Sequence, residues 1–210
     1  MIFDSFVKHM KDVFSDNEII SKELEKLDND YLKVYCDIMN DFRRDLLYVS
    51  DIHGINHNIR TSIFTLVISS SEKLPIEDFA LALEGAKYHD TGRINDFEDY
   101  YHGKRSSEII DFLREKYSEE DLSYLKAIVE AHSIPDKEKD KMIDKYKLQD
   151  KERYYRLLNV LKDSDGLDRV RINDLNPKYL RTEKAKELPD FAYELFENYD
   201  KALGVKVIKR

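Results

Sequence analysis

The adjacent residues His89 and Asp90 form the part of the sequence best suited to chemistry. They follow an apolar run (residues 79–86) that we expect to be a core helix, where a charged pair is costly to bury unless something satisfies it. Asp165 repeats the situation after the apolar residues 157–161. Imidazole and carboxylate groups together suit Zn, Fe, Mn, Ni or Mg, with water in the remaining positions. These residues therefore indicate a divalent-metal site.

Five of the six histidines lie between positions 53 and 132. His53 and His57 are four residues apart, so on a helix both would lie on one face and could bind one ion. The three residues between them lack the glutamate of a zinc-protease helix, which argues against a metalloprotease. Gly54 predicts a helix that begins after His53, which makes His57 the better ligand candidate. Any single histidine taken alone is more often structural than a ligand.

Three segments in this order resemble the HD superfamily of metal-dependent phosphohydrolases. They are HGINHNIR (53–60), YHDTGRINDFEDYYHGKRSSEII (88–110) and LKDSDGLDRVR (161–171). The resemblance implies an all-α bundle in which a divalent ion is bound by His57, His89, Asp90 and Asp165. In the third segment it selects Asp165 over Asp163 and Asp168 as the ligand.

The resemblance also singles out His102 and His132, because HD proteins with two metal ions recruit further histidines after the His-Asp pair. Two ions about 3.5–4 Å apart would clamp both oxygens of an in-line phosphoryl displacement. The alternative is that His102 is a loop or helix-cap residue and that His132 is a cation at a helix C-terminus. The expected cofactor is thus one or two ions of Mn, Mg, Fe, Co, Ni or Zn.

Basic side chains beside the His-Asp pair are candidates for contacts with phosphate. Arg93 lies three residues after Asp90 in a loop expected to line the mouth of the site, and Lys104 and Arg105 lie near a helix N-terminus, which favours anions. A bound ion lowers the pKa of its water, and cationic groups stabilise the equatorial oxygens of the phosphoryl group under attack. We therefore expect Asp90, Arg93, Lys104 and Arg105 to act in catalysis, although basic side chains are more often simply solvated. Asp96 or Asp99 is a further candidate for proton transfer.

Helices must position these residues, because the chain has only six glycines and four prolines and most of it repeats at helical spacing. We predict an all-α, HD-domain-like helical bundle with additional N-terminal helices. Residues 1–48 are expected to be a helical extension packed on the core, residues 49–175 the HD-like core, and residues 176–210 a C-terminal helix completing the same domain. Helices are predicted at about residues 3–14, 19–27, 31–47, 56–71, 76–88, 104–117, 119–132, 137–146, 151–161 and 184–203, with a loop over 92–103.

Composition limits the partners. The formal net charge of −8 argues against strong binding to nucleic acid or an anionic membrane. The single cysteine, Cys36, excludes a disulfide within the chain and fits a reducing compartment. The N-terminus lacks the pattern of a signal peptide, and no run approaches the roughly 20 apolar residues of a membrane span. We expect a cytoplasmic protein without a membrane partner, and a homo-oligomer stays open.

The leading hypothesis is a metal-dependent phosphohydrolase that cleaves a phosphoester of a nucleotide or another small phosphorylated metabolite. The alternatives are a phosphodiesterase with a two-metal site, a nucleotide-binding regulatory module without turnover, and a purely structural helical domain. Tyr100 and Tyr101 could stack on a base. Since the chain has 14 tyrosines, such rings more often pack, and they do not identify the substrate.

Overall fold

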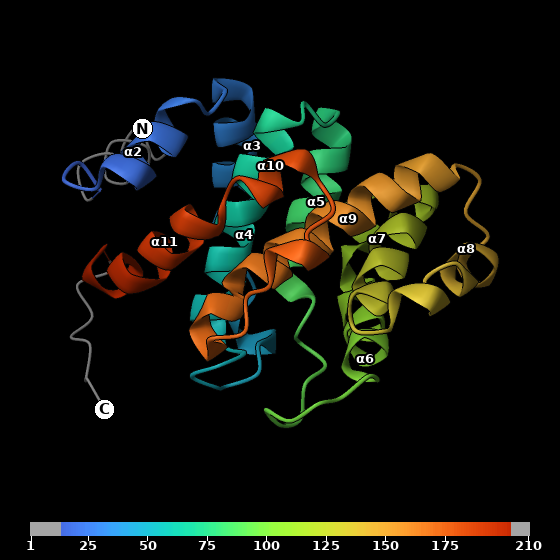
Figure 1. The fold of residues 1–210 in the computed structure, drawn as a ribbon. Coiled ribbons are helices and arrows are strands. Elements are labelled where there is room, and N and C mark those ends of the chain that lie inside the picture. Colours follow the sequence, from blue (N-terminus) through green and yellow to red (C-terminus); the bar gives the residue numbers. More distant parts are fainter. Residues whose placement is uncertain (1–13, 203–210) are drawn as a thin grey trace.

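The computed structural model describes residues 14–202, and the side chains of residues 14–199, as ten α-helices with short 3₁₀ turns and no strand (Figure 1). The all-α prediction is therefore confirmed. The helix predicted for residues 3–14 lies outside the described residues, apart from Phe14, which is buried. Among the described helices, none combines the length and the apolar character needed to cross a membrane.

Four helices form the centre of the bundle. They are α4 (Ile55–Ser71), α5 (Ile76–Tyr88), α7 (Glu119–His132) and α9 (Lys151–Leu167). α5 packs against the other three, and α9 also packs against α4 and α7. As the apolar sequences predicted, α4 and α5 are buried on most sides. One end of this bundle, formed by the first turn of α4 and the last turns of α5, α7 and α9, carries most of the candidate ligands.

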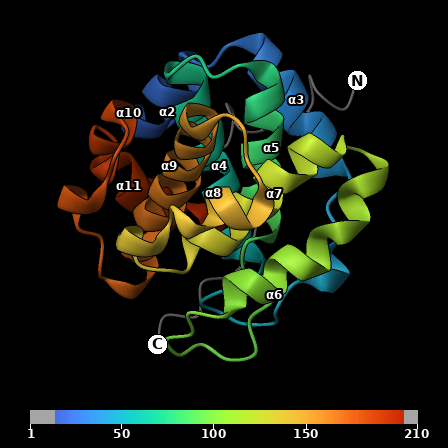
Figure 2. The ribbon, with the colours of Figure 1, turned by 90° about the vertical axis from the view of Figure 1, so that its right-hand side faces the viewer.

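Shorter helices surround this centre. α3 (Asn29–Asn40) packs on α5, and α2 (Glu18–Glu25) packs on the C-terminal helix α11 (Pro189–Ala202). α6 (His102–Ile109) packs on α7, and Figure 2 shows α8 (Lys141–Tyr146) lying beside the same helix. α10 (Glu183–Lys186) contacts α4 and α9. Of the two described N-terminal helices, α3 thus packs on the centre of the bundle and α2 packs on the C-terminal helix.

The observed helix ends differ from the predicted ends at several places. The helix predicted over 31–47 ends at Asn40 and is followed by a 3₁₀ turn, Arg44–Leu46. The prediction ran too far because Phe42 and Leu47 continue the apolar pattern, and they pack on the core without being in the α-helix. The predicted helices 104–117 and 137–146 each combine a short α-helix with a 3₁₀ turn. The predicted helix 184–203 is divided before Pro189, because proline has no N–H with which to continue a helix.

Helix α9 continues to Leu167, six residues beyond its predicted end. Its N-terminus is capped by Asp150, whose side chain accepts a hydrogen bond from the Arg153 amide. The extension places Asp165 on the helix itself and not in a following turn. Its carboxylate therefore projects from a rigid element into the end of the bundle.

Candidate metal centre

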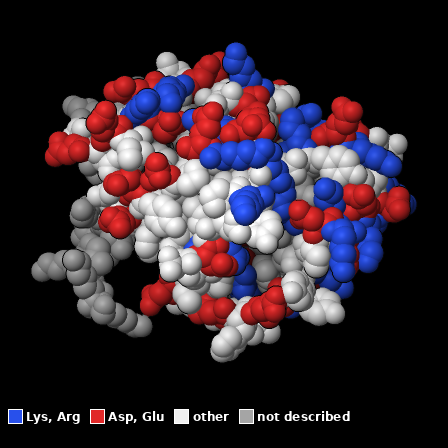
Figure 3. Space-filling model, in the orientation of Figure 1, with Lys and Arg blue, Asp and Glu red and all other residues white. Residues whose placement is uncertain are grey.

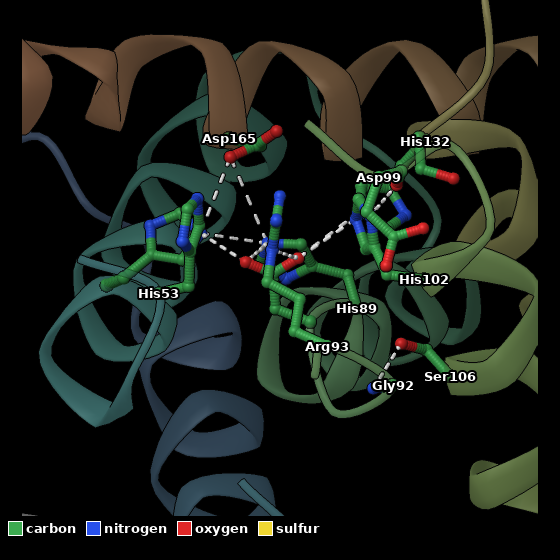
Figure 4. A network of polar contacts seen from close by, with 12 residues as sticks. His53, His89, Gly92, Arg93, Asp99, His102, Ser106, His132 and Asp165 are labelled. Carbon is green, nitrogen blue, oxygen red and sulfur yellow. Dashed lines mark hydrogen bonds and ion pairs between the residues drawn. The ribbon is translucent and has the colours of Figure 1, made fainter. Parts of the chain in front are cut away.

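Six side chains predicted as metal ligands converge from five segments of the chain (Figure 4). Five of their side chains are almost fully buried, and only that of Asp165 is partly exposed, at 28 %. In Figure 4, Asp165 approaches from α9, and His102 and His132 lie on the opposite side of His89 from His53. The six residues are His57 in the first turn of α4, His89 and Asp90 after α5, His102 at the start of α6, His132 at the end of α7, and Asp165 near the end of α9.

A first group of ligand atoms surrounds the Nε2 atom of His57. It lies 3.0 Å from His89 Nε2, 3.4 Å from Asp165 Oδ1 and 3.5 Å from Asp90 Oδ2. Two ligands of a single ion at zinc–nitrogen distances, with angles between 90° and 109°, lie about 2.9–3.4 Å apart. His57, His89 and Asp90 are therefore close enough together to hold one ion, and Asp165 lies beside them, 3.9 Å from His89 Nε2.

A second group lies on the other side of Asp90. The Oδ1 atom of Asp90 lies 3.1 Å from His102 Nε2 and 3.7 Å from His132 Nε2, and the two imidazole nitrogens are 2.8 Å apart. The two carboxylate oxygens of Asp90 thus face different pairs of imidazoles. His57, His89 and Asp90 could hold one metal ion, and Asp90, His102 and His132 could hold another.

Hydrogen bonds at the far nitrogen of each ring prepare these imidazoles as ligands. The Nδ1 atom of His57 lies 2.7 Å from Asp168 Oδ2, and those of His89 and His132 lie 3.0 and 2.5 Å from the carbonyls of Ala86 and Val129. His102 Nδ1 makes the same contact with the Asp99 carbonyl. Because an acceptor at Nδ1 keeps the proton there in a neutral ring, the lone pair is on Nε2, which faces the cluster.

The residues fit a divalent cation. Lone pairs of paired Nε2 atoms only 2.8–3.0 Å apart repel each other unless a cation lies between them. Asp90 Oδ1 is a buried oxygen without a hydrogen-bond partner among the described residues, although it is close to several nitrogens. A buried acceptor of this kind is costly unless it is satisfied. An ion bound between the imidazoles and this oxygen would satisfy all of them.

The protonation states of His89, His132 and Asp90 favour metal binding. Burial lowers the pKa of His89 to about 3 and also lowers the pKa of His132, so both imidazoles are neutral at pH 7. Burial would raise the pKa of Asp90, but the imidazoles around it, first of all His89, hold that pKa well below its ordinary value. For His57, burial and Arg171 oppose protonation, yet its hydrogen bonds to Asp168 and Asp90 raise its pKa.

Asp168 supports His57 from behind. This carboxylate is fully buried and accepts hydrogen bonds from His57 Nδ1 and, at 2.6 and 2.9 Å, from Nε and one terminal nitrogen of Arg60. The Arg60 guanidinium in turn lies over the rings of Phe196 and Tyr199 on α11, 5.1 and 5.5 Å from their centres. The sequence considered Asp168 only as a weaker ligand candidate, and its supporting role was missed. The signal that could have indicated this role was Arg60. It lies about one turn after His57 on a buried helix, so its guanidinium needs a buried acid as a partner.

Arg93 reaches the cluster. Its Nε lies 3.0 Å from Asp90 Oδ1, but the two groups are not oriented as a hydrogen bond. The side chain is mostly buried, with 12 % exposed, and the residue lines the cavity next to His102. Arg93 is therefore the predicted basic residue whose side chain the structure brings to the cluster.

The structure does not bring the other predicted basic residues to the cluster. Arg105 donates to the Gly92 carbonyl at 2.7 Å and pairs with Asp99, so it holds the loop between Gly92 and α6. Lys104 is exposed on α6. Neither is among the residues that line the two cavities at the cluster.

Two further titratable residues near the cluster, Asp163 and His53, are paired with residues outside it. Asp163 is buried and accepts hydrogen bonds from the backbone amides of Arg181 and Thr182, which fixes that segment against α9. His53 is paired with Asp96 at 3.0 Å. His57 and Asp165 are therefore the members of their segments that the fold brings into the cluster.

Two glycines allow the close packing that places His102. A Cβ on Gly92 would lie 2.4 Å from the His102 carbonyl oxygen and from the Ser106 amide. A Cβ on Gly103 would lie 2.7 Å from the Val129 carbonyl oxygen. Distances this short are not tolerated, so Gly92 is required for the loop after α5 to lie against α6, and Gly103 for α6 to lie against α7.

Two cavities meet at the cluster. One has a volume of about 440 Å³ and the other of about 400 Å³, and both are lined by His132, Asp165 and Arg169. On the face seen in Figure 3, Lys and Arg side chains are interspersed with Asp and Glu and are not joined into one basic patch. Because the two cavities share His132 and Asp165, a small ligand in either one could reach the cluster.

The chain matches no known protein-family model, and comparisons with curated proteins and with solved structures find no significant similarity. The helical bundle and its buried His/Asp cluster are compatible with an HD-type metal site.

Proposed function

We propose that this protein is an HD-type metal-dependent phosphohydrolase that cleaves a phosphoester of a nucleotide or another small phosphorylated metabolite. One observation carries the proposal: the carboxylate of Asp90 lies between two pairs of buried imidazoles whose Nε2 atoms converge on it. The order of these residues along the chain is that of the HD superfamily. A structural domain would gain nothing from a buried carboxylate oxygen that accepts no hydrogen bond.

The metal would be held by two sets of side chains that share Asp90. One set is His57, His89, Asp90 and Asp165, and the other is Asp90, His102 and His132. Divalent ions in such a site supply a water of lowered pKa and stabilise charge on phosphoryl oxygens. A carboxylate that bridges two ligand sets favours two ions over one.

The protein's own residues would orient the substrate. Arg93, beside Asp90, would donate to a phosphoryl oxygen and stabilise the charge that develops on it. Asp168 would keep His57 in its ligand orientation. The partly exposed Asp165 lies where the two cavities meet, so the open side of the cluster faces the solvent-accessible cleft.

Metal titration and a substrate screen test the proposal. Metal-free protein would be titrated with Mn²⁺ and Zn²⁺ by calorimetry, and hydrolysis of p-nitrophenyl phosphate, bis(p-nitrophenyl) phosphate and nucleotides would be measured with Mn, Mg, Co, Ni or Zn. We expect metal binding and metal-dependent turnover, both abolished by Asp90→Ala with helicity retained. The control is Asp78→Asn, at a buried carboxylate at the start of α5 that pairs with Arg153 and Arg156. Absence of metal binding, or turnover by Asp90→Ala, would overturn the proposal.

A further inference from the structure

The two cavities that meet at the metal cluster have different chemical linings. The 400 Å³ cavity, here called the loop cavity, is bounded by the loop between α5 and α6. The 440 Å³ cavity, here called the basic cavity, lies between the end of α9 and residues 174–181. Because both include His132, Asp165 and Arg169, a phosphorus atom bound at the cluster would border both cavities.

Aromatic and acidic residues line the loop cavity. Phe97 and Tyr100 belong to its wall, and they are 81 % and 52 % exposed. Large apolar side chains that stay this exposed at the mouth of a cavity indicate a surface for binding. The same cavity carries Asp96, Glu98 and Asp99, which together with Asp165 outnumber its two cations, Arg93 and Arg169, so it disfavours an additional anionic group. The loop cavity therefore suits an uncharged, flat ring system.

Basic side chains dominate the basic cavity. Lys162, Arg169 and Arg181 line it, against the acids Asp165 and Asp174. Arg169 is the most accessible of the three, with 46 % of its side chain exposed, and its partner Asp174 is 61 % exposed. An exposed ion pair is weak, so an incoming anion can compete with Asp174 for the guanidinium. The basic cavity therefore suits a second anionic group.

From these two linings we infer the class of substrate: a phosphodiester or phosphoanhydride with an uncharged ring system on one side of the scissile phosphorus and a second anionic group on the other. The inference rests on the proposed phosphohydrolase function. A monoester has one substituent and would leave one cavity unfilled. In the reaction, the oxygen of water bonds to phosphorus, the bond from phosphorus to one bridging oxygen breaks, and that oxygen leaves with a proton or as an anion.

The loop-side arm of the test compares two exposed aromatic residues of the same loop. Phe97 lines the cavity, whereas Tyr101, 71 % exposed, is not among its lining residues. Binding of adenosine monophosphate and of the non-hydrolysable methylene analogues of adenosine diphosphate and pyrophosphate, named below by their parent compounds, would be measured by calorimetry on the Mn²⁺-loaded full chain. Loss of a stacked ring costs about fivefold or more in affinity. We expect Phe97→Ala to weaken both adenosine ligands to that extent and to leave pyrophosphate unchanged, and Tyr101→Ala to change none of them.

The basic arm compares the two members of one ion pair. Arg169→Gln should weaken adenosine diphosphate and pyrophosphate several-fold more than adenosine monophosphate. Asp174→Asn removes the competitor and keeps the cation, so it should bind these ligands at least as tightly as the wild type. Both residues are exposed, and neither substitution removes a buried partner.

The outcomes separate this inference from the proposed function. Equal effects of Phe97→Ala and Tyr101→Ala, or an Arg169→Gln effect that does not depend on the second phosphate, would overturn the inference. So would equal wild-type affinity for adenosine mono- and diphosphate in a protein that binds Mn²⁺ and hydrolyses p-nitrophenyl phosphate. A chain that neither binds Mn²⁺ nor hydrolyses any phosphoester would overturn the proposed function itself.

Discussion

Substitution of Asp168 by asparagine tests how the cluster is held together. Among the six candidate ligands, Asp168 is hydrogen-bonded only to His57, whose Nδ1 proton it accepts. It also accepts two hydrogen bonds from Arg60. Asparagine keeps the size and one acceptor oxygen but loses the charge that orients the imidazole and increases its basicity. Loss of such a supporting partner typically weakens metal binding about 10–100-fold, or about 1.4–2.7 kcal/mol.

The same substitution also affects folding, and the two effects must be separated. Arg60 is buried, so removal of its charge partner should destabilise the protein by on the order of 3 kcal/mol. The double variant Asp168→Asn/Arg60→Met removes the unpaired charge and should recover much of this stability without recovering metal affinity. Asp163→Asn is the matched control, because Asp163 is an equally buried acid on α9 that holds residues 181 and 182 and does not contact His57.

Calorimetric titration of each metal-free variant with Zn²⁺ at pH 7.5, together with urea unfolding, gives both quantities. We expect Asp168→Asn and the double variant to bind more weakly and Asp163→Asn to lose stability only. Wild-type affinity in Asp168→Asn would refute the supporting role. An equal loss in Asp163→Asn would show that metal affinity merely follows stability.

Three further predictions concern packing, pH and metal removal. Gly103→Ala should push α6 away from α7, cost about 1–3 kcal/mol of stability and selectively weaken binding of a second ion in a calorimetric titration. Gly166→Ala, where a Cβ meets only a side-chain carbon at 3.6 Å, should bind metal as the wild type does. The folded-state pKa of His89, about 3, lies below the ordinary value of 6.5, so its contribution to stability is present above pH 6.5 and is lost as the pH falls towards 3. Metal-free protein should therefore lose about 2–3 kcal/mol between pH 6.5 and 4.5 from His89 alone in urea unfolding, and His89→Gln should reduce the total loss by this amount, leaving the loss due to His132. Removal of the metal with a chelator should lower the calorimetric Tm by about 5–10 °C relative to protein in a free metal concentration of 100 times the Kd. An unchanged Tm would contradict a metal site that contributes to folding.

The sequence predicted the meeting of the cluster residues better than it predicted their surroundings. His89 and Asp90 stood out because a charged pair at the end of an apolar helix needs a partner, and the order of the three segments added His57, His102, His132 and Asp165. The structure brings these six side chains together. Their service as metal ligands stays a prediction.

The surroundings depend on contacts between distant segments, which spacing does not reveal. Asp168 meets His57 and Arg60 across more than 100 residues of sequence. Arg105 is turned away from the cluster by hydrogen bonds within its own loop, which no periodicity indicates. A short-range pattern gives the face of a helix, but only the packed fold gives the partner.

Helix ends show the same limit. The predicted helix 151–161 stopped short of the polar residues 162–165 and Gly166, but the packing of α9 on α4, α5 and α7 extends the helix to Leu167. After Asn40 the reverse occurs, since Phe42 and Leu47 keep the hydrophobic pattern while the chain leaves the helix. Tertiary contacts decide these boundaries.

The contacts of His89 and His132 with the carbonyls of Ala86 and Val129 have a consequence for folding. Those carbonyls belong to the last turns of α5 and α7, where backbone acceptors lack partners from the helix itself. Each imidazole therefore terminates its helix through one nitrogen and offers the other to an ion. Replacing either histidine would fray the end of a central helix as well as remove a donor.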